Sequence, residues 1–187
     1  LTKLQTERWN KIAERFQKDF PVKYYHCANS CGFCFANEIN ANVGRSGIAL
    51  YGIGPGLKPA LKIKSIISEI REIEAGESVG YGGTFIAERK SRIATVPVGY
   101  FEGLNRKLSG KGVFIIGDAV APVVGRVSMN ISSCDVSNLE VDVGDTVTII
   151  SNNPEDQNSI ENIAKISETL PYEILVNIPP HLRRVLV

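Results

Sequence analysis

The chain has 187 residues, enough for one large or two small domains, and its 43% hydrophobic and 22% charged residues are typical of a globular protein. Its net charge is +1, with Lys and Arg spread along the sequence, which argues against a nucleic acid or a membrane surface as partner. No apolar run reaches the roughly 18 residues that a membrane-spanning helix needs.

The first part of the chain alternates predicted helices and strands. Residues 1–18 form an amphipathic helix whose apolar residues recur at spacings of three to five: Leu1, Leu4, Trp9, Ile12, Phe16 and Phe20. Because this helix starts at the first residue, which is not Met, we expect the chain to be the C-terminal piece of a longer polypeptide. Beyond Pro21 the sequence predicts a strand over 22–25, a short helix over 29–37 capped by Asn29 or Ser30, and a strand near Val43. This alternation over residues 1–55 is typical of βα units in a parallel sheet or barrel.

After Pro55 and Pro59 the pattern becomes mainly β. A long strand with one register break is predicted over 61–74, and shorter strands over 92–98, 112–117, 120–128, 130–136 and 145–151. Ser159 is the expected cap of one helix, and the last predicted strand covers 172–176. Short strands separated by turn signals suggest a small β-sandwich or barrel.

The stretch 79–85 places Tyr81 among three glycines inside this β region. Glycine weakens a strand and marks a bulge or a close approach of the backbone to another group. The phenol of Tyr81 is therefore expected on a kinked, unshielded backbone where it can face a ligand, although a plain glycine-rich hairpin would carry the same signal.

Three of the four cysteines, Cys27, Cys31 and Cys34, are crowded into eight residues. This clustering suits a reducing cytosol better than a disulfide framework. The spacing also matches the three thiolates with which radical S-adenosylmethionine enzymes hold a [4Fe–4S] cluster. The alternative interpretation is that these cysteines are small apolar side chains that fill a buried turn.

A second group of residues could bind an anion. The hydroxyl of Ser30 at a helix start and the backbone amides of Gly47 and Ile48 after a strand would suit a phosphate. Arg45 ends that strand, where a barrel presents its active-site groups, and a neutral His26 could accept a hydrogen bond from it. The competing interpretation is a surface arginine and a core histidine.

Taken in order, five segments resemble the C-terminal half of alanine racemase, a pyridoxal-phosphate enzyme. They are His-x-Ala-Asn-Ser from His26, Arg-x-Gly-Ile-Ala-x-Tyr-Gly from Arg45, Val-x-Tyr-Gly-x-Thr from Val79, Gly-Tyr-x-x-Gly from Gly99 and Gly-Arg-x-x-Met from Gly125. The resemblance covers residues from about 24 to the end. It implies an α/β plus mainly β fold: residues 1–55 would be the last βα units of a TIM-type barrel that binds the cofactor, and residues 56–187 a C-terminal β domain.

The resemblance also implies a role for each site residue. Tyr81 matches one of two catalytic acid/bases, the other being a lysine that carries the cofactor. Arg45 matches the arginine that faces the pyridine nitrogen and disfavours its protonation, and His26 matches its hydrogen-bond partner. The remaining matches are Ser30, Gly47 and Ile48 to phosphate contacts, Tyr100, Arg106 and Arg126 to the substrate access channel, and Met129 to a residue beside the substrate carboxylate.

The sequence departs from the family pattern in two places. Asn130 stands where many members carry aspartate, which removes a charge near the site. Pro179 and Pro180 occupy the region where some members place a phosphate-binding tyrosine, so phosphate binding would depend more on Ser30 and on the missing half.

The resemblance implies an isomerase that makes D-alanine for peptidoglycan in the cytoplasm, working as a homodimer in which Tyr81 of one subunit serves the barrel of the other. No lysine of this chain lies in the context of the cofactor lysine, so we expect the chain alone to be inactive and to need the missing N-terminal barrel half. Serine-specific or broader relatives share these motifs. The alternatives are a radical [4Fe–4S] enzyme and a non-catalytic β-domain module.

Overall fold

The computed structural model describes residues 2–186 and divides into two compact units, Leu1–Ala60 and Leu61–Val187. We describe each unit by itself. In residues 2–186, none of the helices is both long and apolar enough to cross a membrane.

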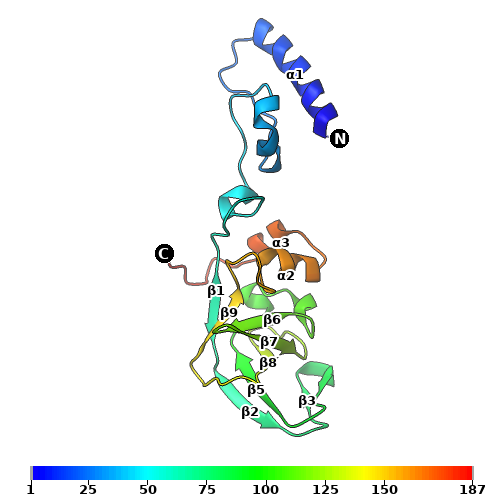
Figure 1. Ribbon diagram of the computed structural model, residues 1–187, viewed down its shortest axis with the longest axis vertical. Coiled ribbons are helices and arrows are strands. Elements are labelled where there is room, and N and C mark those ends of the chain that lie inside the picture. Colours follow the sequence, from blue (N-terminus) through cyan, green and yellow to red (C-terminus); the bar gives the residue numbers. More distant parts are fainter. Residues whose placement is uncertain (1, 187) are drawn as a thin grey trace. The chain divides into compact units, whose positions relative to one another are not determined.

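The first unit is built from helices and extended loops (Figure 1). Its elements are α1 (Thr2–Asp19) and the 3-10 helices η1 (Cys31–Glu38) and η2 (Ile48–Tyr51). Two side chains of α1 attach it to the end of η1: Trp9 Nε1 donates to Asn40 O at 2.8 Å, and Asn10 Oδ1 accepts from the Asn40 N–H at 2.8 Å. The predicted helix over 1–18 is confirmed from Thr2 onward, and residue 1 lies outside the described residues.

The strands predicted over 22–25 and near Val43 are wrong, since residues 2–60 contain no strand. The two segments nevertheless lie side by side: the Asn42 N–H donates to Tyr25 O at 3.1 Å and the Arg45 N–H donates to Ala28 O at 2.9 Å. The equal offset of the two pairs means that the segments run parallel. These two hydrogen bonds do not establish a pair of strands. Parallel strands are normally hydrogen-bonded to a neighbouring strand on each side.

The second unit is a curled antiparallel sheet with the strand order β1-β9-β6-β7-β8-β5-β2. Its strands are β1 (Ile63–Ile66), β2 (Glu69–Ile73), β5 (Ser91–Val96), β6 (Val113–Ile116), β7 (Ala119–Val124), β8 (Ser132–Asp135) and β9 (Thr146–Ile150). The two edge strands are consecutive in the chain, and the residues between them bond to both sides. The Ile67 N–H donates to Asp145 O and the Ser68 N–H donates to Thr95 O, each at 2.9 Å. The long strand with one break and the mainly β class are therefore confirmed.

The core of this unit lies inside the curled sheet. Burial alternates along β6, where Phe114 and Ile116 are buried and their neighbours are half-exposed. The largest fully buried side chains include Ile67, Ile93, Phe114, Val147 and Ile149. Such burial of large apolar side chains provides most of the stabilisation of a small β domain.

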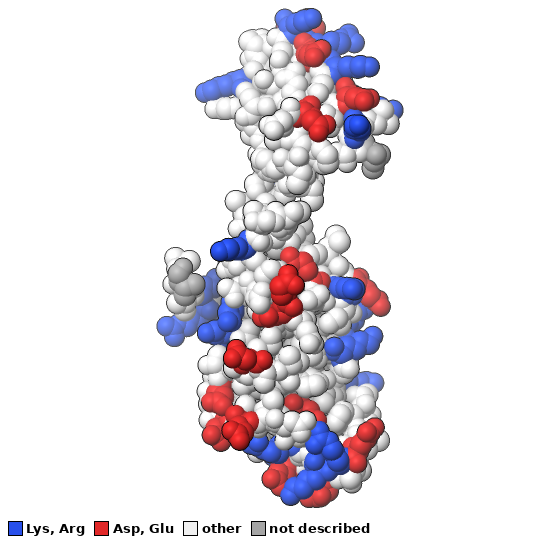
Figure 2. Space-filling model, viewed as in Figure 1, with Lys and Arg blue, Asp and Glu red and all other residues white. Residues whose placement is uncertain are grey.

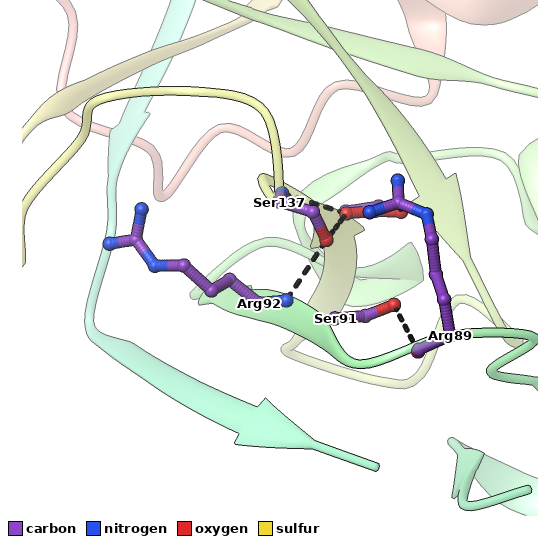
Figure 3. A network of polar contacts seen from close by, with 5 residues as sticks. Arg89, Ser91, Arg92 and Ser137 are labelled. Atoms are coloured by element: carbon purple, nitrogen blue, oxygen red, sulfur yellow. Dashed lines mark hydrogen bonds and ion pairs between the residues drawn. The ribbon is translucent and has the colours of Figure 1, made fainter. Parts of the chain in front are cut away.

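A polar network joins β5 to β8 and the residues after it (Figure 3). Ser137 Oγ accepts a hydrogen bond from the Arg92 N–H at 2.9 Å and donates to Asp135 Oδ1 at 2.5 Å. The guanidinium of Arg92 donates to the carbonyls of Leu139 and Val141 at 2.9 and 3.1 Å. These bonds tie residues 137–141 to the sheet.

Two short helices follow the last strand. Ser159 caps α2 (Ile160–Ile166), as predicted, with its Oγ accepting from the Asn162 N–H at 3.4 Å. The strand predicted over 172–176 is wrong, because these residues form α3 (Pro171–Val176). Pro171 stands in the first turn, where a missing N–H costs nothing, and α3 buries Ile174 and packs on α2.

Candidate functional site

The Tyr81 loop connects the short strands β3 (Ser78–Val79) and β4 (Phe85–Ile86) through the 3-10 turn η3 (Tyr81–Gly83). Gly80 and Gly82 have φ of 78° and 74°, values that a residue with a side chain adopts only at a cost. The loop turns sharply as a result, and the Tyr81 side chain is 74% exposed. The expectation of an unshielded phenol on a kinked backbone fits this geometry.

Arg126 lies directly against this loop. A Cβ added to Gly82 would lie 3.6 Å from the Arg126 Cζ, and one added to Gly80 would lie 3.2 Å from the Arg126 backbone nitrogen. The two glycines therefore allow the backbone of one segment and the guanidinium of the other to approach closely. Tyr81 and Arg126 belong to one connected surface of the second unit.

The residues after Arg126 hold the Tyr100 loop. The Tyr100 N–H donates to Ser128 O at 3.0 Å and the Phe101 N–H donates to Met129 O at 2.9 Å. Tyr100 opens the 3-10 turn η4 (Tyr100–Glu102), and both Tyr100 and Met129 are exposed. Segment 126–129 thus contacts the Tyr81 loop at one end and the Tyr100 loop at the other.

The carboxylate of Glu102 links the start of the Tyr100 loop to the segment that follows Met129. Its Oε2 accepts from the Gly99 N–H at 2.8 Å, and its Oε1 accepts from Asn130 Nδ2 at 2.9 Å. An aspartate at position 130 would offer a second carboxylate in place of this donor and would repel Glu102. Asn130 therefore serves as a hydrogen-bond donor in the loop that carries Met129.

Arg106 belongs to the 3-10 turn η5 (Arg106–Leu108) and lies over the ring of Tyr100, with its Cζ 5.8 Å from the centroid. Ser109 Oγ donates to Arg106 O at 2.5 Å and accepts from the Val127 N–H at 3.0 Å. Contacts between neighbouring loops of the second unit in this way link five of the predicted site residues: Tyr81, Tyr100, Arg106, Arg126 and Met129.

The Lys, Arg, Asp and Glu side chains are interspersed over both units on the face that Figure 2 shows, without a broad area of one sign. This distribution agrees with the net charge of +1.

The predicted anion-binding residues lie in the first unit. Ser30 Oγ accepts hydrogen bonds from the N–H groups of Gly47 at 2.9 Å and Ala49 at 3.3 Å. The amide of Gly47 is therefore already paired, and Ala49 is a participant that sequence reasoning missed, since nothing in its residue type signals the contact. Ser30 keeps its own hydroxyl proton to donate, and Ile48 lies at the start of η2 between the two paired amides.

Arg45 and His26 are both exposed, and residues 2–186 contain no hydrogen bond between them. Arg45 Nη2 donates instead to the carbonyl of Cys27 at 3.4 Å. Partial burial raises the pKa of the Cys27 thiol, and the charge of Arg45 opposes that rise. Within residues 2–186 the guanidinium of Arg45 makes no other hydrogen bond.

Comparison with known families then gives the decisive observation. The family description "Alanine racemase, C-terminal domain" matches residues 60–186, and "Alanine racemase, N-terminal domain" matches residues 1–55. The chain belongs to the alanine racemase family. The strands and loops that carry Tyr81, Tyr100 and Met129 are thus those of an alanine racemase C-terminal domain.

Curated alanine racemases resemble the chain along nearly its whole length. The protein from Citrifermentans bemidjiense is 36% identical over 98% of this chain and 52% of its own length, and alanine racemase 2 from Caldanaerobacter subterraneus is 35% identical over 98% of this chain and 50% of its own. The chain spans about half the length of the curated relatives it matches.

Solved alanine racemases share the fold. The enzyme from Bartonella henselae, crystallised with covalently bound pyridoxal phosphate, superposes with a TM-score of 0.83 at 30% identity and covers 93% of this chain and 50% of its own. The enzyme from Streptomyces lavendulae superposes with a TM-score of 0.88 at 25% identity over 96% of this chain.

The iron–sulfur alternative finds no support in the geometry. Residues 2–186 contain no group of three or more His, Cys, Asp or Glu side chains placed to hold a metal ion. Cys31 and Cys34 are exposed and Cys27 is half-buried, so the expectation that these residues fill a buried turn is not met either.

The second departure from the alanine racemase pattern lies beside the Tyr100 loop. Gly103 contacts residues 177–179, since a Cβ there would lie 2.8 Å from Asn177 O, and the Phe101 ring stacks on His181 with centroids 4.9 Å apart. Pro180, between these contacts, is exposed and offers no hydroxyl to a phosphate.

Proposed function

We propose that this chain is the C-terminal part of an alanine racemase, an isomerase that interconverts L- and D-alanine with pyridoxal 5′-phosphate, and that Tyr81 is one of its two acid/bases. In this proposal residues 1–55 are the end of the cofactor-binding barrel and residues 56–187 are the β domain. The observation that carries it is the exposed phenol of Tyr81 on the glycine loop that Arg126 lines, in a chain of this family.

The residues of the first unit fit a phosphate and a pyridine ring. Ser30 has its hydroxyl proton available, because its oxygen already accepts from the amides of Gly47 and Ala49. Ile48 presents the next amide at a turn start, and Arg45 has guanidinium donors free for the pyridine nitrogen. Bound pyridoxal phosphate supplies stabilisation of negative charge at the substrate α-carbon. Because Arg45 donates to the carbonyl of Cys27 and, in the described part of the chain, makes no hydrogen bond to His26, His26 would orient Arg45 only if the two side chains moved closer together.

The second unit supplies the proton and the substrate contacts. Tyr81 holds or accepts a proton at its phenolic oxygen, on one face of the α-carbon. Met129 borders the substrate carboxylate, and Tyr100, Arg106 and Arg126 line the route by which a small amino acid reaches it. D-alanine made in this way in the cytoplasm would serve peptidoglycan synthesis.

The partners follow from what is exposed. The side chains of Ile12 and Phe16 in α1, and of Phe20 directly after it, are each 54% exposed, which is unusual for an apolar helix face in a finished domain. We infer that the N-terminal barrel half covers this face. We also infer a homodimer in which Tyr81 of each subunit completes the barrel site of the other.

The test is a chimera in which residues 1–187 replace the matching C-terminal half of the Citrifermentans bemidjiense protein. The chimera should racemise alanine, whereas the 187-residue chain with pyridoxal phosphate should form no D-alanine at enzyme-like rates. Tyr81→Phe should lower kcat by about 10²–10⁴. Tyr172→Phe, an exposed tyrosine on α3, is the matched control and should have no effect.

Exchange of the alanine α-proton with solvent deuterium tests whether Tyr81 acts on one face of the substrate. If Tyr81 serves one face, the Tyr81→Phe chimera should still exchange the α-proton of one alanine enantiomer and lose exchange of the other. Equal loss for both enantiomers would point to a structural defect and contradict the assignment.

The shared site is tested by mixing two inactive chimeras, Tyr81→Phe and Arg45→Ala. If each site takes Arg45 from one subunit and Tyr81 from the other, a mixed dimer contains one intact site, and random mixing should restore roughly a quarter of the wild-type activity. If both residues come from the same subunit, no activity returns.

A further inference from the structure

The segment Cys31-Gly32-Phe33-Cys34 has no task in the proposed racemase. All four cysteines of the chain are free thiols, and they differ in accessibility: Cys31 and Cys34 are exposed, Cys27 is half-buried and Cys134 is buried. Burial raises the pKa of Cys134 to about 12, so that thiol stays protonated and unreactive. The two exposed thiols are therefore a pair set apart from the others.

The local helix type brings the two cysteines together. Cys31 begins η1, and the helical φ/ψ angles are first interrupted at Phe35, so Cys31 and Cys34 span one undisturbed 3-10 turn. In a 3-10 helix residues three apart lie on the same side, one above the other, about 6 Å apart along the axis. This separation lies inside the range of Cα distances, roughly 4.4–6.8 Å, that a disulfide bridges.

The residues between the cysteines anchor this turn to its neighbours. A Cβ on Gly32 would lie 2.9 Å from the Ala28 Cβ, and one on Gly44 would lie 2.4 Å from the Cζ of Phe33. Asn29 Oδ1 also accepts from the Gly32 N–H at 3.0 Å. The turn is thus held through Gly32 and Phe33, while the cysteines that flank them remain exposed.

We propose that Cys31 and Cys34 form a redox-active dithiol, a modification site that takes a low-molecular-weight disulfide as its oxidant. One thiolate attacks a sulfur of glutathione disulfide, whose S–S bond breaks and releases one glutathione, leaving a mixed disulfide. The second cysteine then attacks the protein sulfur of that mixed disulfide and expels the second glutathione. Two electrons pass from the protein dithiol to glutathione disulfide, and the two thiol protons end on two glutathione thiols.

The experiment equilibrates the full 187-residue chain with mixtures of reduced and oxidised glutathione, alkylates the remaining thiols and measures the intact mass. We expect one internal disulfide, seen as the loss of two hydrogen atoms. Its equilibrium constant in buffer should exceed that in urea by about tenfold or more, because the folded turn raises the effective concentration of one thiol at the other.

Serine variants are needed to show which two cysteines are joined. Trypsin would release residues 24–45 as one peptide that holds Cys27, Cys31 and Cys34 together, so a digest alone cannot distinguish the possible pairs. Cys27→Ser should form the disulfide as the wild type does. Cys31→Ser and Cys34→Ser should instead accumulate a single glutathione adduct on the remaining exposed thiol.

Three results would overturn the proposal: a wild-type chain that carries glutathione on both cysteines without an internal bond, loss of the bond in Cys27→Ser, or an equilibrium constant no larger in buffer than in urea. The first and third results are measured on the wild type, so they do not depend on whether the serine variants fold. They use no racemase activity, so they succeed or fail independently of the proposed function.

Discussion

Gly99 holds the Tyr100 loop in place because it has no side chain. A Cβ at this position would lie 2.3 Å from both Ser128 O and Met129 O, the carbonyls that accept from Tyr100 and Phe101. Since Gly99 has a φ of −149°, an extended value that any residue adopts, only the overlap opposes a substitution. We predict that Gly99→Ala displaces the loop from residues 128–129 and lowers the free energy of unfolding of the second unit by roughly 2–3 kcal/mol.

Urea denaturation followed by far-UV circular dichroism measures this loss. Gly117→Ala is the matched control, because Gly117 has a φ of 60° and no atom within 4 Å of an added Cβ. The control carries only the conformational cost of an L-residue, about 1 kcal/mol. Equal losses for the two variants would show that the contact of Gly99 with residues 128–129 contributes nothing.

At the same scale, the sequence motifs named candidate site residues but not the hydrogen bonds that these residues make. The exposure of Tyr81 follows from its glycine neighbours, because they fix the backbone locally. The pairing of Ser30 with Ala49, and of Asn130 with Glu102, joins residues 19 and 28 positions apart. Such contacts depend on how loops meet in space, which local sequence does not encode.

At the end of α2, Glu168 has an unfavourable backbone conformation but a side chain that forms a favourable ion pair. The Thr169 N–H donates to Ala164 O and the Glu168 N–H donates to Lys165 O, the bonds of a Schellman motif, and Glu168 has a φ of 53° where glycine is preferred. Glu168 also pairs with Lys107 at 2.8 Å, and this hydrogen bond and charge lower the pKa of the Glu168 carboxyl. A lowered pKa means that the ion pair stabilises the fold above the unfolded pKa and is lost as pH falls through the folded pKa.

We predict that Glu168→Gly stabilises the second unit, and that the gain over wild type grows as pH falls below about 4, where the wild type has lost its ion pair. Part of the gain arises because glycine adopts a left-handed backbone conformation without the strain of an L-residue, and this part does not depend on pH. Urea midpoints at neutral and acidic pH measure it. Glu168→Gln keeps the backbone strain, so it should fall below wild type at neutral pH and match it in acid; a pH-independent gap for both variants would contradict this account.

At the scale of elements, the predicted strands were right where a sheet could form around them and wrong elsewhere. Residues 61–74 and the later β runs found antiparallel neighbours, whereas residues 22–25 make a single backbone hydrogen bond to the parallel segment beside them, from the Asn42 N–H to Tyr25 O. Residues 172–176 look like a strand by composition, but Pro171 opens the helix α3, which buries Ile174 and packs on α2. Short apolar runs are decided by their neighbours, not by their own residues.

The two units of the chain differ sharply in what they bury. Among residues 2–60 the buried apolar side chains are Ala13, Ala28, Ile53 and Pro59, whereas the second unit buries large side chains such as Phe114 and Ile149 completely. Apolar burial is the main source of stability, so the first unit should unfold at a much lower urea concentration than the second. The chain offers a clean probe, because Trp9 is its only tryptophan and lies in the first unit.

We therefore predict two transitions that do not coincide: tryptophan fluorescence, which reports the first unit, should change only in the first, whereas circular dichroism, to which both units contribute, should change in the first and again when the sheet unfolds. Asn10→Ala removes the hydrogen bonds to the Asn40 N–H and Glu38 O, both 2.8 Å, and should move only the fluorescence transition, by about 1–2 kcal/mol. Phe114→Ala opens a cavity in the core of the second unit and should move only the sheet transition, by about 3–5 kcal/mol. Coincident transitions that both variants shift together would mean that the units fold as one cooperative body, because a mutation in one independent unit cannot change the midpoint of the other.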